Sequence, residues 1–303
     1  MEPIDRARLS LDGLSVGDAF GQQFFGGEGE MLRRIENREV PEAPWYLTDD
    51  SIMAIAVVDV LEDYGGIDQD ALATKFAESY QRNPSRGYGG TAHRILQALA
   101  RAEPWGEVSR SLFDGMGSYG NGAAMRVAPL GAYFADDLDV LIENAIRSAA
   151  VTHSHPEAQA GAVAVALAAA WAWRTRSSKS PGRELLDFVA GHLGESETRR
   201  MISRAAALPI SRPAATAAQM LGNGEKMSSQ DTVPFCLWCA ARHIDDFEEA
   251  IWTAASGLGD RDTTCAIAGG IVAMRADTAT FPADWITRRE SLEDWVAKPE
   301  RWG

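Results

Sequence analysis

The chain has 303 residues, of which 46% are hydrophobic and 24% are charged, and its formal net charge is −14. This composition is ordinary for a globular protein with a large core, and the negative charge argues against general nucleic-acid binding, because phosphate contacts require Lys and Arg. With only three cysteines we expect no disulfide framework, which fits a reducing, cytoplasmic compartment.

The N-terminal segment has no basic stretch followed by an apolar run, so we expect no signal peptide. Further along, apolar residues recur mostly at helical spacing, and no run shows the alternation of β-branched residues that is typical of strands. The pattern therefore predicts an all-α fold. Helices are expected over residues 49–62, 69–81, 92–102, 138–150, 157–175, 184–193, 197–207, 235–243, 246–256 and 263–275.

Glycine-rich stretches at residues 24–30, 83–90, 114–122 and 221–226 are typical of loops. The longest uncharged apolar run, residues 158–173, is shorter than the roughly 20 residues that a membrane span needs. We therefore expect a buried core helix there and no membrane association. The polar stretch 174–184 lies between apolar helices, which indicates a surface loop and a single domain over residues 1–303.

The first acidic turn stands at the start of the helix expected over residues 49–62, where Thr48 precedes Asp49 and Asp50. Capping explains this turn when it is considered alone. Thr48 or Asp49 can accept a hydrogen bond from an unpaired N–H of the first turn, and negative charge suits the positive end of the helix dipole.

A second acidic turn near the other end of the chain contains Asp260 and Asp262, followed by Thr263 and a helix of small residues. If the two turns face each other, four carboxylates would lie close together and would resist ionising together. Divalent cations would remove this repulsion, and four charges suit two ions better than one. Ligands that are all oxygen select Mg²⁺, Mn²⁺ or Ca²⁺, and neither turn offers the Cys or His of a zinc site.

Six segments resemble motifs of the ADP-ribosylglycohydrolase family, the group that includes dinitrogenase reductase-activating glycohydrolase. SYGNGAAMRVAPLG is closest to the branch that removes O-linked ADP-ribose. The resemblance implies an all-α fold, a dinuclear Mg²⁺ or Mn²⁺ centre, and hydrolysis at C1″ of ADP-ribose on a protein side chain or small molecule. The segments, in the family's order, are LDGLSVGDAFG (11–21), TDDSIMA (48–54), RGYGG (86–90), SYGNGAAMRVAPLG (118–131), THSHPEAQAGAVAVA (152–166) and GDRDTTCAIAGGIVA (259–273).

The resemblance also implies roles for individual residues. The metal-ligand positions are Thr48, Asp49, Asp50, Asp260, Asp262 and Thr263. The positions that contact ADP-ribose are Gly89, Gly90, Phe113, Ser118, Tyr119, Gly120, Asn121, Gly122 and His153, with Phe113 facing the adenine. These roles are physically reasonable, because backbone N–H groups of a glycine-rich segment bind a diphosphate without cationic side chains, and an aromatic ring offers adenine a flat face. Without the resemblance, SYGNG could be an ordinary turn, His153 a helix cap and Phe113 a core residue.

The chain departs from the family at one catalytic position. The family usually carries a glutamate four residues after the last glycine of GDAxG, and that position here is Phe25. The loop could be displaced so that Glu28 or Glu30 reaches the site, a ligand carboxylate such as Asp50 could activate water, or the protein could bind ADP-ribose without turnover. We favour the first explanation with Glu28, and take Glu28 and Asp50 as the candidate catalytic residues.

Two alternatives to this function stay open. One is hydrolysis of another ribosyl or nucleotide-like substrate, and the other is a catalytically weak ADP-ribose-binding protein, because the fold also occurs in eye-lens crystallins. The substrate linkage, the physiological metal and the oligomeric state are left undecided.

The C-x-x-C pair of Cys236 and Cys239 lies in an apolar helix and indicates buried thiols. A C-terminal packing patch or interface is expected from Trp285, Trp295 and Trp302.

Overall fold

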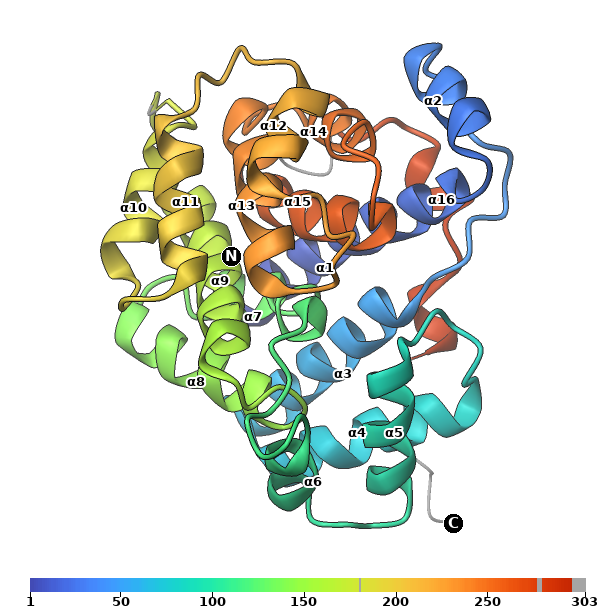
Figure 1. Cartoon of the computed structure of the whole chain (residues 1–303), viewed down its shortest axis with the longest axis vertical. Helices are drawn as coiled ribbons and strands as arrows, with labels where there is room; N and C mark the ends of the chain where they lie inside the picture. The colour runs from blue at the N-terminus through green and yellow to red at the C-terminus, as the bar shows by residue number, and fades with distance from the viewer. Residues whose placement is uncertain (180, 277–279, 296–303) are drawn as a thin grey trace.

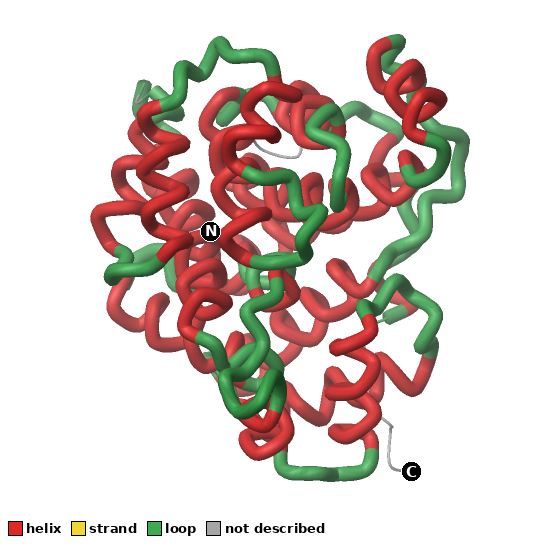
Figure 2. The backbone as a smooth tube through the Cα atoms, viewed as in Figure 1, coloured by secondary structure: helices red, strands yellow, loops and turns green. Residues whose placement is uncertain are grey.

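The computed structural model describes residues 1–179, 181–276 and 280–295, and over these ranges it consists of helices and loops without a strand (Figures 1 and 2). The all-α prediction is confirmed. The α-helices are α1 (Pro3–Gly21), α2 (Glu28–Glu36), α3 (Asp49–Tyr64), α4 (Gln69–Arg82), α5 (Gly90–Ala100), α6 (Trp105–Ser111), α7 (Ala128–Tyr133), α8 (Leu138–Ala150), α9 (Pro156–Thr175), α10 (Glu184–His192), α11 (Glu197–Ala207), α12 (Ala214–Leu221), α13 (Ser229–Arg242), α14 (Phe247–Ala255), α15 (Arg261–Ala276) and α16 (Trp285–Arg288). The short 3₁₀ segments are η1 (Gln22–Phe24), η2 (Asn121–Ala123) and η4 (Leu292–Asp294).

Helices α1 and α15 cross at the centre of the molecule and run antiparallel (Figure 1). Glycines of α1 allow the close approach. A Cβ placed on Gly17 would lie 2.2 Å from the carbonyl oxygen of Cys265, and one on Gly21 would lie 2.3 Å from that of Arg261. Because no side chain fits between them, the two backbones meet directly, and this contact fixes where the N-terminus of α15 sits relative to the C-terminal half of α1.

The remaining long helices surround this pair. Helix α9 is built almost entirely of Ala and Val along its buried length and packs against α7, α8, α13 and α15. It is the buried core helix that residues 157–175 predict, and no described helix is long and apolar enough to cross a membrane. Cys236 and Cys239 are buried in α13 as free thiols, as expected.

The C-terminal segment packs onto the start of the fold. Trp285 is buried and stacks on Phe20 of α1 with 4.5 Å between ring centroids. Trp295 is also buried, and its ring lies 4.9 Å from the guanidinium carbon of Arg86. The expected packing patch is therefore confirmed for Trp285 and Trp295, whereas Trp302 lies outside the described residues.

The end of one predicted loop and the start of one predicted helix are wrong. The glycine-rich stretch 24–30 is a loop only in its first part, because α2 begins at Glu28 and buries Met31 and Ile35 on one face. Helix α13 begins at Ser229 and therefore includes Pro234 in its interior, although the sequence indicates a start after this proline.

Candidate functional site

The two acidic turns meet. Helix α3 and helix α15 both begin at the same place, so that the hydroxyl of Thr263 lies 3.4 Å from Oδ2 of Asp50. Asp50 and Asp262 are buried there, and a third buried aspartate, Asp18 of α1, joins them. One carboxylate oxygen from each of these three lies within 4.8 Å of the others.

Asp18 was not among the predicted site residues. Its carboxylate accepts hydrogen bonds from the backbone N–H groups of Thr48 (3.0 Å) and Ser51 (3.2 Å) and from both hydroxyls, with Thr48 Oγ1 at 2.7 Å from Oδ1. These donors occupy most of its lone pairs, so Asp18 holds the Thr48–Ser51 turn in place. The signal was present in the sequence as an aspartate on the otherwise apolar, glycine-containing face of α1.

Asp50 has an oxygen atom that a cation would satisfy. Among the described residues its buried Oδ1 atom has no hydrogen-bond partner, and an unsatisfied buried acceptor costs about 1–3 kcal/mol. Thr48 caps α3 through its hydroxyl, which accepts from the Asp50 N–H at 3.3 Å, so the capping interpretation of this turn is also right. An all-oxygen donor set with an unpaired carboxylate oxygen fits a hard divalent ion.

The pKa values of the carboxylates are raised. Burial, and then the negative charge of Asp262, raises the pKa of Asp50 well above its usual value. Burial and the charge of Asp260 do the same for the pKa of Asp262. Burial, followed by the charges of Asp18 and Asp260, raises the pKa of Asp49 to about 8. Carboxylates this crowded retain protons unless a cation replaces them.

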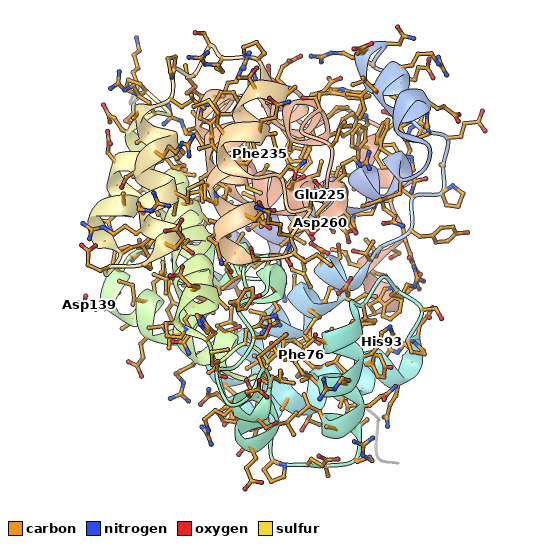
Figure 3. The ribbon with its side chains drawn as sticks, viewed as in Figure 1. Phe76, His93, Asp139, Glu225, Phe235 and Asp260 are labelled. Carbon is orange, nitrogen blue, oxygen red and sulfur yellow. The ribbon has the colours of Figure 1, made fainter. Side chains whose placement is uncertain are left out.

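A cavity of about 310 Å³ opens from these carboxylates. All the residues predicted to contact ADP-ribose border it, as do Asp49, Asp50, Asp260, Asp262 and Thr263. Thr48 borders a neighbouring hollow instead. In Figure 3, Asp260 lies near the middle of the molecule, between the elements that carry these groups.

Phe113 and Tyr119 also border the cavity and form an aromatic pair with 5.9 Å between ring centroids. Phe113 is 45% exposed and Tyr119 is 41% exposed, so neither is a core residue. Their faces are available to a planar ligand. His153 does not cap a helix either, because the N-cap of α9 is His155, whose ring accepts from the Glu157 N–H at 3.1 Å.

The SYGNG segment, residues 118–122, is held by hydrogen bonds to the loop before α13 and to the start of that helix. The sequence alone predicts no role for this loop. The N–H of Asn121 donates to the carbonyl of Met227 (3.2 Å), and that of Ser229 donates to Tyr119 (3.1 Å). The Asn121 side chain donates to Oδ2 of Asp260 at 2.8 Å, which ties the glycine-rich segment to the carboxylates. Lys226, in the same loop, is the only Lys or Arg among the described residues that border the cavity.

Comparison with known proteins decides the family. The sequence model of the ADP-ribosylglycohydrolase family matches residues 1–300 of the chain. The chain belongs to the ADP-ribosylglycohydrolase family. It is 27% identical to ADP-ribosylhydrolase ARH3 of Mus musculus, over 96% of this chain and 89% of the relative.

Other members of the family show the same extent of similarity. The chain is 26% identical to ARH3 of Homo sapiens, over 96% of this chain and 91% of the relative. It is 25% identical to ADP-ribosylarginine hydrolase Tri1 of Pseudomonas putida, over 95% of this chain and 75% of the relative. A solved structure described as an ADP-ribosylglycohydrolase-related protein complex shares the fold, with a TM-score of 0.68, 24% identity, and coverage of 97% of this chain and 95% of the other.

This member of the ADP-ribosylglycohydrolase family has an unusual contact beside the carboxylates. Phe25, which stands at the position of the family's glutamate, is 43% exposed, and its ring lies 4.9 Å from the guanidinium carbon of Arg261. Arg261 in turn occupies the threonine position of the family motif GDTDT. The two departures from the family's motifs therefore lie against each other. Neither residue borders the cavity.

The displaced glutamates lie at the start of α2. Glu28 is the first residue of that helix, but its side chain lies outside the described part of the structure. Glu30 is exposed. Whether either carboxylate contributes to the chemistry is therefore a matter for proposal.

A second hollow, of about 360 Å³, adjoins the cavity. Gly87 borders both spaces, and Thr48 borders the second one next to Asp49 and Asp50, which border the first. The wall of this hollow includes Arg86, whose guanidinium pairs with both carboxylate oxygens of Glu290 at 2.8 and 2.9 Å. The second hollow thus lies beside Thr48, on the turn that carries Asp49 and Asp50.

Proposed function

We propose that this protein is a metal-dependent hydrolase that cleaves the glycosidic bond at C1″ of ADP-ribose and releases ADP-ribose from a modified protein side chain or small molecule. The observation that carries the proposal is that one cavity is bordered by buried carboxylates, by exposed aromatic rings and by the glycine-rich segment. Membership of the ADP-ribosylglycohydrolase family supports it.

Thr48, Asp49, Asp50, Asp260, Asp262 and Thr263 would hold two Mg²⁺ or Mn²⁺ ions. Such ions, when bound, orient ribose hydroxyls and activate water for attack on the anomeric carbon. The Asn121 amide donates a hydrogen bond to Asp260 and so would hold the ribose-binding segment at a fixed position relative to the metal ions.

The rest of the cavity suits the remainder of ADP-ribose. Backbone N–H groups at Gly89 and Gly90, where α5 begins, would bind the diphosphate, with Lys226 as an added positive charge, and residues 118–122 would enclose the diphosphate and ribose. Phe113 and Tyr119 would pack on the adenine. His153 would contact the ligand beside Gly120 and Gly122, and the adjoining hollow would receive the leaving group.

Glu28 is our candidate for the group that moves a proton to or from the reacting oxygens. Phe25 cannot do this, and Glu28 is the nearest carboxylate after it in the chain. Activation of water by Asp50 is the alternative. The free, buried cysteines support a reducing cytoplasmic environment, in which ADP-ribosylated proteins or small molecules would be the partners.

The proposal is tested with purified protein and a panel of Ser-, Arg- and nucleic-acid-linked ADP-ribose, each incubated with Mg²⁺, Mn²⁺ or EDTA. We expect release of free ADP-ribose from at least one linkage with metal and none with EDTA. In the same assay Glu28→Gln should lower kcat by at least about tenfold while ADP-ribose affinity changes little, and Glu30→Gln tests the other glutamate of the displaced loop.

The outcomes separate the alternatives. Tight ADP-ribose binding with no turnover of any linkage would replace the enzyme by the binding-protein alternative. Absence of ADP-ribose binding in metal-replete buffer would overturn the proposal. Wild-type rates in both Glu28→Gln and Glu30→Gln would transfer the proton-moving role to a ligand carboxylate such as Asp50.

A further inference from the structure

Three polar residues form a buried chain that ends at the cavity. Arg126, in the segment between η2 and α7, has no exposed surface. Its Nη2 donates to the carbonyl of Ser148 at 2.8 Å and to Oγ1 of Thr152 at 3.0 Å. Its guanidinium carbon lies 4.5 Å from the ring centroid of Phe76, a residue labelled in Figure 3. Oγ1 of Thr152 is in turn 2.7 Å from Nδ1 of His153.

The protons along this chain can be assigned one by one. A guanidinium has donors and no acceptor, so the Thr152 oxygen accepts from Arg126. Burial lowers the pKa of Arg126 to about 9, which still leaves the group charged at neutral pH. The hydroxyl of Thr152 has a single hydrogen, and the acceptor at hydrogen-bond distance that can take it is Nδ1 of His153. Nδ1 is therefore an acceptor and carries no proton.

The state of the ring follows from this assignment. A neutral imidazole with a bare Nδ1 carries its proton on Nε2. Burial, and then the charge of Arg126, lowers the pKa of His153 to about 3, so the ring stays neutral across the physiological range. Among the described residues we find no hydrogen bond to Nε2.

The Nε2 atom faces the glycine-rich segment. A Cβ on Gly122 would lie 3.1 Å from it, and one on Gly120 would lie 3.2 Å from it, so both positions must stay free of side chains for the ring to fit. His153, Gly120 and Gly122 all border the cavity. The N–H of the ring is thus directed to the place where the ligand would pass.

We propose that Thr152 and Arg126 are positioning residues that fix the proton of His153 on Nε2, so that the ring offers a neutral N–H donor to an acceptor oxygen of the bound ligand, a phosphate or ribose oxygen. The opposite tautomer would present a lone pair there and would repel such an oxygen. The identity of the ligand as ADP-ribose rests on the proposed function, whereas the proton position in the free protein does not.

The test is ¹⁵N NMR of the histidine rings in the full-length, metal-loaded protein, with the His153 signals assigned by their loss in His153→Gln. We expect a protonated Nε2 and a bare Nδ1 from pH 5 to pH 8. Thr152→Val keeps the shape but removes the hydroxyl. It should shift the ring to the other tautomer or to a mixture and weaken ADP-ribose binding by about tenfold, and Thr152→Ser should restore both properties.

Thr198→Val is the matched control. Thr198 is another buried threonine, and its hydroxyl donates to Glu157 at 2.7 Å, away from the cavity. It should change neither the tautomer nor the affinity. A wild-type ring protonated on Nδ1 or on both nitrogens at pH 7 would overturn the inference even if Thr152→Val does not fold, and so would an unchanged tautomer in Thr152→Val. Failure of the wild type to bind ADP-ribose would instead count against the proposed function.

Discussion

Asp50 is a buried carboxylate whose Oδ2 lies within hydrogen-bond distance of the Thr48 and Thr263 hydroxyls and whose Oδ1 has no partner among the described residues. Such an arrangement is costly unless a cation completes it. Capping accounts for the Thr48 hydroxyl and for the charge at the start of α3, but it does not account for Oδ1. Cation binding by the first acidic turn therefore accounts for the Oδ1 atom of Asp50, which helix capping does not explain.

At this scale the site could be predicted only in part. The acidic turns were recognisable because their aspartates lie on glycine-led or polar turns at helix starts. Asp18 was missed although it lies on the apolar, glycine-containing face of α1, because the local sequence shows no partner for it. Its role depends on Thr48 and Ser51, which are distant in sequence and are brought to it by packing. Nothing local in LGNGEK predicts that Lys226 borders the same cavity.

Replacement of a cluster carboxylate tests the metal site. Asp262→Asn removes one negative ligand while it keeps the shape, so we expect loss of hydrolysis and loss of the rise in Tm that Mg²⁺ or Mn²⁺ gives the wild type. In EDTA the variant should unfold at the same or a higher temperature, because one crowded carboxylate is gone. Differential scanning fluorimetry with a metal titration measures both effects.

The control for this variant is Asp139→Asn. Asp139 is an exposed residue at the start of α8, at the outer edge of the molecule in Figure 3 and far from Asp260. It should keep both activity and the metal-induced rise in Tm. A wild-type metal response in Asp262→Asn would refute the assignment of Asp262 as a ligand.

At the scale of elements, the crossing of α1 and α15 connects the core to the site. Asp18 lies one residue after Gly17, and Asp262 lies one residue after Arg261, whose carbonyl meets Gly21. The spacing of the carboxylates is therefore set by backbone contact between two helices, not by flexible side chains. A small shift in this contact should therefore change the distances between the carboxylates.

We expect Gly17→Ala to destabilise the fold by about 1–3 kcal/mol or more, because the added Cβ would lie 2.2 Å from a backbone oxygen that cannot move aside cheaply. It should also weaken metal binding, since Asp18 and Asp262 would be pushed apart. Chemical denaturation and a metal titration measure the two effects. Gly191→Ala in α10 is the control, because nothing lies within 4 Å of its Cβ, and there the change should be neutral or slightly stabilising.

Most of the long helices were predicted, but α1, which has 19 residues, was not among the helices that the apolar spacing indicated. The sequence indicated α3, α4, α8, α9, α11 and α15 to within about two residues at each end. It did not indicate α2, α6, α7 or α12, which are short and depend on tertiary contacts more than on their own propensity. The helix predicted over residues 235–243 lacks the first turn of α13 and Pro234, because packing of that turn against the SYGNG segment extends the helix to Ser229.

At the scale of the whole molecule, the charge of −14 is in apparent conflict with an anionic ligand. The structure suggests how the two are reconciled. Part of the negative charge is concentrated in the buried cluster, where divalent cations would neutralise it, and the cavity wall beyond it consists largely of glycines and uncharged side chains. We therefore expect metal binding to precede or accompany ligand binding.

The same cluster predicts how stability depends on pH. In the metal-free protein the pKa values of Asp18, Asp49, Asp50 and Asp262 are raised by burial, and that of Asp49 is about 8. Between the ordinary aspartate pKa of about 4 and these raised values, the folded protein binds more protons than the unfolded chain, so the free energy of unfolding must fall as pH rises. The slope is about 1.4 kcal/mol per pH unit for each proton that the folded state retains.

Denaturant titrations between pH 6.5 and 8 isolate this effect, because the lowered pKa of His153 and of His243 changes stability in the opposite direction only below about pH 6.5. We expect the EDTA-treated protein to lose stability steeply across this window and the protein with Mg²⁺ or Mn²⁺ to change little, since bound ions leave no protons on the carboxylates to be released. If the free energy of unfolding depends on pH equally with and without metal, the carboxylates do not hold the ion. A steeper decline with metal than without it would contradict the sign of the linkage itself.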